Sequence, residues 1–134
     1  MTKNEDIQKK IVEFQVLEAN LKILQDRTEN LNEKMEEFQS TRMAIEELKE
    51  TKPNEALIPL GSGIFVTGNV EKSENLIVDI GSGIVLKNSR EKVIEIIENK
   101  IKELEKDIKI VTEQSMSIIL RLEKIREEVE KTQK

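Results

Sequence analysis

The chain has 134 residues, a formal net charge of −5, and no cysteine or histidine. This composition excludes disulfides, thiolate chemistry and the usual histidine bases and metal ligands, and the interleaved acids and bases leave no basic face for nucleic acid. No apolar run approaches the ~18 residues of a membrane span and the N-terminus is too polar for a signal peptide, so we expect a cytoplasmic single domain over residues 1–134, without membrane or nucleic-acid partners.

The first predicted element is a long helix over residues 6–50. In alternating steps of three and four from Phe14, eight of ten positions are apolar, which is the a/d repeat of a coiled coil. Pro53 then predicts the end of the helix, because its ring cannot continue the hydrogen-bond ladder. The seam positions of this helix are Phe14, Leu17, Leu21, Leu24, Thr28, Leu31, Met35, Phe38, Arg42 and Ile45.

The middle segment, residues 51–88, contains all five glycines and an internal repeat at an offset of 20 residues. Residues 58–66 read IPLGSGIFV and residues 78–86 read VDIGSGIVL. Each unit is a short apolar strand, a Gly-Ser-Gly turn and a second strand, which predicts two β-hairpins. No helix start follows either turn, so these glycines do not form a phosphate-binding loop. The turn residues are Gly61, Gly63, Gly81 and Gly83.

Two short hairpins cannot stabilise themselves, and their edges are unpaired. We therefore expect other chains to complete the sheet, which makes oligomerisation a requirement. The apolar residues that we expect to oligomerise are Leu57, Ile58, Leu60, Ile64, Phe65, Val66, Val70, Ile77, Val78, Ile80, Ile84, Val85 and Leu86.

A second long helix is predicted over residues 89–132. Asn88 with Glu91 three residues later has the pattern of a capping box. Ten of the eleven seam positions are apolar, and the polar ones in both helices are expected to help fix the register. The positions are Ile94, Ile97, Ile101, Leu104, Ile108, Val111, Ser115, Ile118, Leu122, Ile125 and Val129.

Two helices of matched length, joined by a segment that brings the chain back, predict an antiparallel coiled coil with both termini at the far end. The fold class is mainly α with a small β insert. Several apolar residues near the termini lie off the seam or beyond the reach of the partner helix, and a cluster of exposed apolar residues usually binds something. Single apolar residues on a surface are also common, so the alternative is that these residues have no binding role.

Carboxylates are abundant, but two helices without a cleft give them no place to converge for acid–base chemistry or metal binding. The chain also lacks a nucleophile with a partnering base. We expect no enzyme, catalytic residue, metal or cofactor.

The order of long helix, doubled hairpin and long helix, with LIPLGSGIFVTG at residues 57–68 and IVDIGSGIVL at residues 77–86, resembles the archaeal-type α class of the prefoldin family. The resemblance implies a hetero-hexamer of two α and four β subunits, in which the hairpins form a β-barrel platform. It also implies an ATP-independent chaperone that holds unfolded client proteins at the coiled-coil tips and passes them to a group II chaperonin. Client contact would fall to apolar residues near both termini: Ile7, Ile11, Val12, Phe14, Val16, Ile118, Ile119, Leu122, Ile125 and Val129.

Two other classes of function stay open. A structural spacer or tether would use the hairpins only to oligomerise and would bind no client. An adaptor would dock one specific partner with a helix face and would show one tight, stoichiometric ligand.

Overall fold

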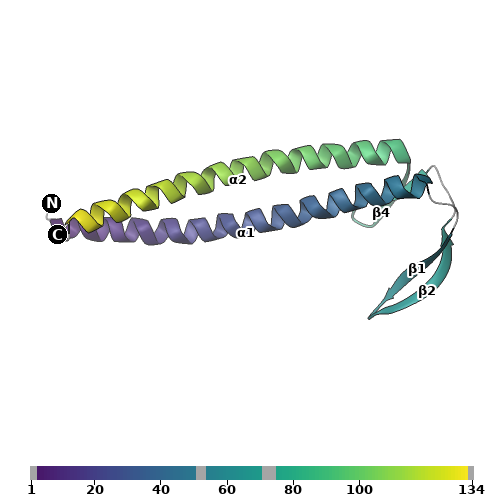
Figure 1. The fold of residues 1–134 in the computed structure, drawn as a ribbon, viewed down its shortest axis with the longest axis horizontal. Coiled ribbons are helices and arrows are strands. Elements are labelled where there is room, and N and C mark those ends of the chain that lie inside the picture. Colours follow the sequence, from purple (N-terminus) through teal and green to yellow (C-terminus); the bar gives the residue numbers. More distant parts are fainter. Residues whose placement is uncertain (1–2, 51–53, 71–74, 133–134) are drawn as a thin grey trace. The chain divides into compact units, whose positions relative to one another are not determined.

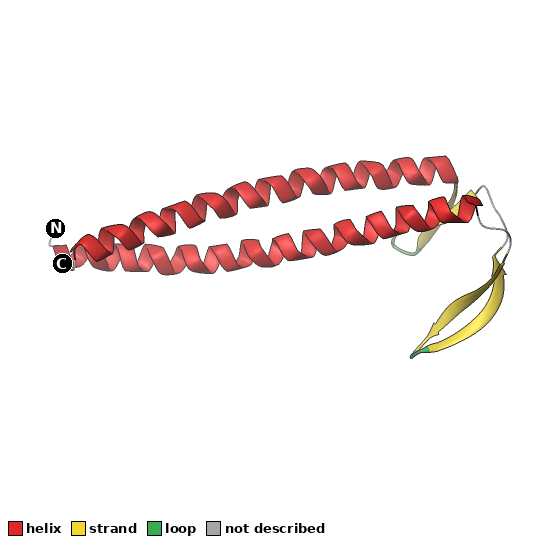
Figure 2. Ribbon diagram, viewed as in Figure 1, coloured by secondary structure: helices red, strands yellow, loops and turns green. Residues whose placement is uncertain are grey.

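The computed structural model describes residues 3–50, 54–70 and 75–132. Two long helices flank two antiparallel hairpins, as the sequence predicts (Figure 1, Figure 2). The elements in chain order are α1 (Lys3–Glu50), β1 (Asn54–Gly61), β2 (Ile64–Val70), β3 (Asn75–Gly81), β4 (Ile84–Ser89) and α2 (Arg90–Thr132). Pro53, predicted to end the first helix, lies outside the described residues. Neither described helix is long and apolar enough to cross a membrane.

The chain divides into two compact units. One holds the chain up to Met35 and from Lys102 onward, and the other is Glu36–Ile101. In the first unit α1 and α2 lie side by side and antiparallel, with the start of α1 beside the end of α2 (Figure 1). The second unit contains the end of α1, the four strands and the start of α2.

The seam of the coiled coil is where the periodicity predicts it. Every predicted a/d position of both helices is buried or half-buried, and Val111 and Ile125 are the most deeply buried side chains among the described residues. Two of the three polar seam residues, Thr28 and Arg42, have partners of their own. Thr28 donates its hydroxyl hydrogen to the carbonyl of Leu24 at 2.9 Å, and within the second unit Arg42 forms an ion pair with Glu98 of α2 at 3.0 Å.

The start of α2 corrects one prediction. The backbone N–H of Lys92 donates to the Ser89 side-chain oxygen at 3.2 Å, so Ser89 caps the helix. The capping box predicted for Asn88 and Glu91 is therefore wrong by one residue. The reason is that β4 continues to Ser89, and Asn88 is still paired with Leu76 of β3.

Each hairpin is a separate two-stranded antiparallel sheet. Ile58 lies opposite Val66 in the first hairpin, and Val78 lies opposite Leu86 in the second. Both strand pairs shift register by one residue immediately before the turn. The 20-residue repeat in the sequence is thus a repeat of strand, bulge, turn and strand.

Candidate functional site

The hairpins display most of their apolar side chains to solvent in the single chain. Of the thirteen residues predicted to oligomerise, twelve are exposed and Val78 is half-buried. Leu57, Leu60 and Ile77 are each about two-thirds exposed or more, at 67%, 68% and 75%. A surface of this apolar content is costly in water and is typical of an interface that another chain covers.

The register gives each hairpin two unlike faces. Ile58, Ile64 and Val66 share one face of the first hairpin, because strand residues two apart point the same way and paired residues share a side. The matching face of the second hairpin carries Val78 and Leu86. These continuous apolar faces are the best-formed candidates for assembly.

The other face distinguishes the two hairpins. The first hairpin pairs Pro59 with Phe65, whereas the second pairs Asp79 with Val85. Asp79 accepts a hydrogen bond from the backbone N–H of Gly81 at 2.8 Å, which fixes the start of the second turn. No signal in the sequence repeat indicates this bond, because Pro59 holds the equivalent place in the first unit.

Residues predicted to contact clients fall into three classes of exposure in the coil. Ile11, Val12 and Val16 are exposed, with 42%, 58% and 54% of their surface accessible, and Ile125 is buried between the helices at 1%. The others are half-buried and contribute to the seam or its margin: Ile7, Phe14, Ile118, Ile119, Leu122 and Val129.

The structure adds exposed apolar residues that the sequence reading missed. Ile23 on α1 is 64% exposed, and α2 exposes Ile110, Met116 and Leu120. All four lie off the a/d register. The rule that identified the off-seam residues near the termini would have found them too, had it been applied along the whole coil.

Ion pairs join the two helices near their free ends. Arg121 donates two hydrogen bonds to the Glu13 carboxylate, at 2.8 and 3.1 Å, and Lys10 pairs with Glu128 at 3.2 Å. The hydrogen bond from Arg121 lowers the pKa of Glu13, and the hydrogen bond from Lys10 lowers the pKa of Glu128. A bidentate pair of this kind fixes the geometry of both partners.

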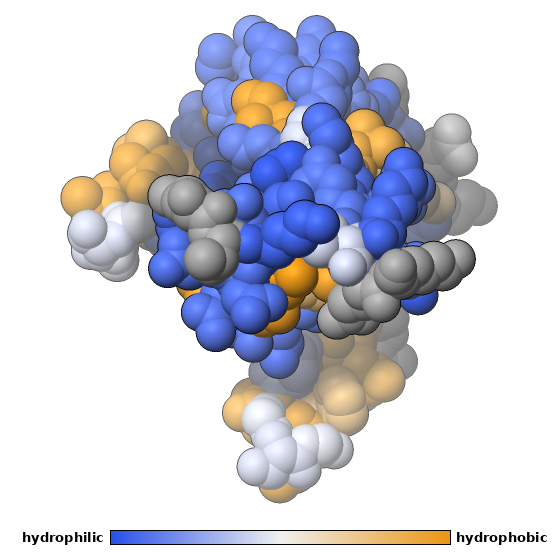
Figure 3. Space-filling view, turned by 90° about the vertical axis from the view of Figure 1, so that its left-hand side faces the viewer, coloured by the Kyte–Doolittle hydropathy of each residue, from blue (hydrophilic) through white to orange (hydrophobic). Residues whose placement is uncertain are grey.

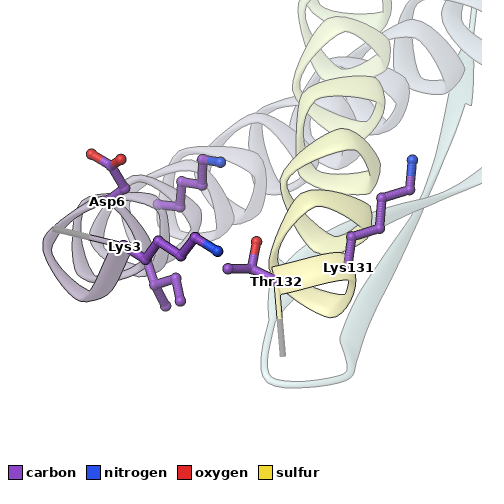
Figure 4. A pocket seen from close by; sticks show the side chains of 6 residues that line it. Lys3, Asp6, Lys131 and Thr132 are labelled. Carbon is purple, nitrogen blue, oxygen red and sulfur yellow. The ribbon is translucent and has the colours of Figure 1, made fainter. Parts of the chain in front are cut away.

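The free end of the coil is itself polar. A shallow hollow of about 410 Å³ is lined there by Lys3, Asp6, Ile7, Lys10, Lys131 and Thr132. Lys3 and Thr132 extend toward each other from the two helices (Figure 4). Viewed from this end, the surface is mostly hydrophilic with small separate apolar patches (Figure 3). The exposed apolar residues therefore lie along the helices instead of lining a deep apolar cup.

No cluster of acidic residues in the described ranges is arranged to hold a metal ion. The hollows found on the described part of the first unit are open and shallow, and most are lined by charged side chains. What the arrangement offers is apolar contact surface on the hairpins and along the arms of the coil.

The family model and the similar proteins point to the same family. The family model for prefoldin, described as prefoldin subunit, matches residues 17–134. The prefoldin subunit alpha of Pyrococcus horikoshii is 38% identical over 109 residues, covering 79% of this chain and 73% of that protein. The prefoldin subunit alpha of Archaeoglobus fulgidus is 29% identical over 130 residues, covering 96% of this chain and 95% of that protein.

A solved structure shares the fold. It is described as a filamentous PFD from Methanocaldococcus jannaschii and superposes with a TM-score of 0.74 at 21% identity. The match covers 86% of this chain and 96% of that one. The two long helices and the hairpins between them are therefore an arrangement that another protein also adopts.

Proposed function

Because this chain belongs to the prefoldin family, as a subunit of the archaeal α type, we propose that it is an ATP-independent holding chaperone for non-native proteins in the cytoplasm. In this proposal the free ends of the helices contact the client, the hairpins assemble the complex, and the client passes on to a group II chaperonin. The observation that carries the proposal is that apolar residues are exposed both on the hairpins and along the paired helices, which we call the arms.

Assembly is assigned to the hairpins, and the proposed complex is a hetero-hexamer of two copies of this chain with four β-type subunits. The support is physical. A two-stranded sheet is marginal on its own, and here its apolar faces are open to water. Burying them against strands of neighbouring subunits removes that cost and pairs the open strand edges.

Client contact is assigned to the apolar residues near both termini. Ile11, Val12 and Val16 can touch a client directly, since they are exposed. The half-buried members of the predicted set contribute through their accessible edges, and Ile125 requires the helix ends to separate first. Each arm binds weakly because its contact area is small. Several arms on one client raise the effective concentration of the next contact, so binding is useful yet reversible in steps.

The proposal is tested with Val12→Ser and Val16→Ser combined, in the complex with β-type subunits. We expect about threefold more complex to be needed for half-suppression of aggregation of an unfolding enzyme, because two apolar contacts per arm are lost. Light scattering measures this. Gln15→Ser with Asn32→Ser is the matched control, since both residues are exposed and polar.

A complex that suppresses aggregation equally well with and without the two valines would favour a structural spacer. A single tight, saturable partner in place of broad suppression would favour an adaptor. Sedimentation of each variant complex shows that assembly is unchanged, which keeps the client step separate from the hairpin step.

A further inference from the structure

The outward faces of α1 and α2 carry regularly spaced charges. When the seam positions of each heptad are a and d, the b and f positions point away from the partner helix. In the first unit, four consecutive b and f positions of α1 are charged, and so are four consecutive b and f positions of α2. The charged residues are Lys22, Asp26, Glu29 and Glu33 on α1, and Lys102, Lys106, Lys109 and Glu113 on α2.

These eight charges are not used within the arm. All eight side chains are exposed, and none of them forms an ion pair with another described residue of the chain. The ion pairs that do join the two helices, such as Arg121 with Glu13, lie at the seam or beside it. The outward charges are therefore open to a partner outside the arm.

The two sets of charges match in both sign and spacing. From Lys22 onward, α1 carries one base and then three acids, at steps of four, three and four residues. From Glu113 backward, α2 carries one acid and then three bases at the same steps. Because both helices rise about 1.5 Å per residue, two antiparallel helices bring all four pairs opposite one another at once. The pairs are Lys22 with Glu113, Asp26 with Lys109, Glu29 with Lys106 and Glu33 with Lys102.

The same register continues into apolar residues toward the free ends of the helices. Ala19 lies three residues before Lys22, and Met116 lies three residues after Glu113, so these two face each other next. One turn further on, Leu120 would lie against the aliphatic part of Gln15. Met116 and Leu120 are 54% and 59% exposed in the single chain. The register therefore covers two apolar side chains that the seam leaves in water.

This register also fits two arms that point the same way. Glu13 and Arg121 lie at one height of the arm, because they are hydrogen bonded. Asp26 lies thirteen residues along α1 from Glu13, and Lys109 lies twelve residues back along α2 from Arg121. Both positions are therefore at nearly the same height. Two arms side by side, with their free ends level, would place the four charge pairs opposite one another.

We propose that the outward face of α1 binds the outward face of α2 of a second copy of this chain, with the free ends of the two arms level; this rests on the hairpin assembly proposed above. The partner is a second copy because the matching charges are on the same sequence. Exposed ion pairs are individually weak, so the contact forms where assembly already holds two copies at high effective concentration. Since it joins α1 of one copy to α2 of another, each pair of arms leaves one face of each kind free.

The test is a disulfide placed in this register. The chain has no cysteine, so Ala19→Cys with Met116→Cys introduces only two. Within one arm both residues point away from the seam on different helices, so a bond that needs Cα atoms within about 7 Å must join two copies. After oxidation with diamide, the complex with cysteine-free β-type subunits is expected to give a linked dimer of this chain on a non-reducing gel. Peptide mass spectrometry should show residue 19 joined to residue 116.

A matched control moves one cysteine out of the register. Ala19→Cys with Glu123→Cys keeps an exposed outward position on α2 but shifts it by one heptad. We expect about fivefold less linked dimer from this control, because the two Cα atoms are then too far apart.

Charge reversal separates the proposed register from random collision. In the Ala19→Cys, Met116→Cys background, Asp26→Lys, Glu29→Lys and Glu33→Lys make both outward faces basic, and we expect about fivefold less linked dimer. Adding Lys102→Glu, Lys106→Glu and Lys109→Glu restores opposite signs and should restore the dimer. This rescue also shows that the first three changes did not act by unfolding the helices.

Sedimentation of each variant separates the two proposals. If the variants assemble with β-type subunits but the register and control cysteines link equally, the arm contact is wrong and the hairpin assembly stands. A failure of the second set of reversals to restore the dimer, or a bond between residue 19 of one copy and residue 19 of another as the main product, would also overturn the arm contact. If the unaltered chain forms no complex with β-type subunits, the hairpin assembly fails and the arm contact loses its basis.

Discussion

At the scale of single residues, Glu13 and Arg121 are the most sharply defined contact between the two helices. Their side chains make two hydrogen bonds across 108 residues of sequence. Exposed ion pairs usually contribute little to the stability of a fold, but a pair held in fixed bidentate geometry contributes more. This pair and the one between Lys10 and Glu128 hold the register of the coil beside the exposed Ile11 and Val12.

Glu13→Gln is expected to lower the thermal midpoint of the assembled complex. The amide keeps the shape of the side chain but has no charge and presents only one acceptor oxygen to the guanidinium. Circular dichroism at 222 nm measures the helix signal. Glu18→Gln is the matched control, because Glu18 is an exposed glutamate of the same helix. Equal midpoints for both variants would mean that the Arg121 contact does not stabilise the coil.

The same pairs predict a dependence on pH with a definite sign. The folded-state pKa values of Glu13 and Glu128 are lowered from the ordinary 4.5. Their contribution is therefore complete above about pH 4.5 and is lost as pH falls through the lower folded-state values. Thermal midpoints of wild type and Glu13→Gln should converge in acid. A gap that widened below pH 4.5 would contradict this assignment.

Gly68 tests the packing on the apolar face of the first hairpin. A Cβ atom there would lie 2.6 Å from Cδ1 of Ile58, so the isoleucine must move. Gly68→Ala is expected to weaken assembly by only about 0.5–1.5 kcal/mol, because the end of the Ile58 side chain must leave its preferred rotamer on a face that we propose neighbouring strands cover. Adding Ile58→Val removes Cδ1 and should restore assembly. Sedimentation velocity measures it, and a double variant as weak as the single one would rule out this contact as the cause.

The sequence predicts single residues correctly where the pattern lies within one helix, as it does for the a/d positions. The seam could be counted because burial repeats every three or four residues along each helix. The Glu13–Arg121 pair could not be predicted, since it depends on how far one helix is shifted against the other. Arg42 shows the limit well: its place on the seam was predicted, but its partner Glu98 depends on that same shift.

At the scale of elements, the two turns explain why the Gly-Ser-Gly repeat marks hairpins. Ser62 and Ser82 both have φ of 53°, and each is followed by a glycine that also has positive φ. Two successive residues with positive φ are what a type I′ turn requires, and this turn matches the twist of paired strands. Glycine adopts the positive φ of the second turn position without strain, whereas serine adopts the positive φ of the first turn position less readily.

Ser62→Asn with Ser82→Asn is expected to stabilise the hairpins. Asparagine tolerates the left-handed region better than serine, which relieves part of the roughly 1 kcal/mol that a non-glycine residue pays there, about 0.5 kcal/mol per turn. Scanning calorimetry of the complex should give a higher midpoint. Gly63→Ala in the same assay should lower it, and a rise for both variants would contradict the turn assignment.

The elements themselves were largely predictable. Long helices follow from sustained periodicity without glycine or proline, and the hairpins follow from the repeat. The start of α2 was misplaced by one residue because strand pairing with Leu76 competes for Asn88. Strand pairing depends on residues elsewhere in the chain, so it cannot be predicted from the local capping pattern around Asn88.

At the scale of the whole molecule, the chain carries two kinds of apolar surface, which differ in how densely the exposed apolar residues are grouped. The hairpin faces are dense and two-sided, whereas the arms expose separate residues among charges. Dense apolar faces favour permanent partners, and sparse ones favour contacts that come and go. In the function that we propose, assembly therefore belongs to the middle of the chain and client contact to its ends.

The chain alone is expected to self-associate heterogeneously, because its hairpin faces have nothing to cover them. Mixing with a β-type subunit should give one species with the mass of two copies of this chain and four partners. Native mass spectrometry distinguishes the two cases. Ile64→Asp with Ile84→Asp should abolish the mixed species, because it puts a charge on each apolar face. A stable monomer of the unaltered chain would contradict the assembly role.

The pairing of Glu13 with Arg121 also has a consequence for synthesis. The ribosome makes Glu13 first and must add 108 residues before its partner exists. At ~5–20 residues per second, the seam of α1 stays without its partner helix for roughly 5–20 s. During that time the leucines and isoleucines of the α1 seam are exposed to water, and exposed apolar side chains of this kind make unfinished proteins prone to aggregation. A subunit for which we propose the holding of non-native chains is thus, early in its own translation, a non-native chain itself.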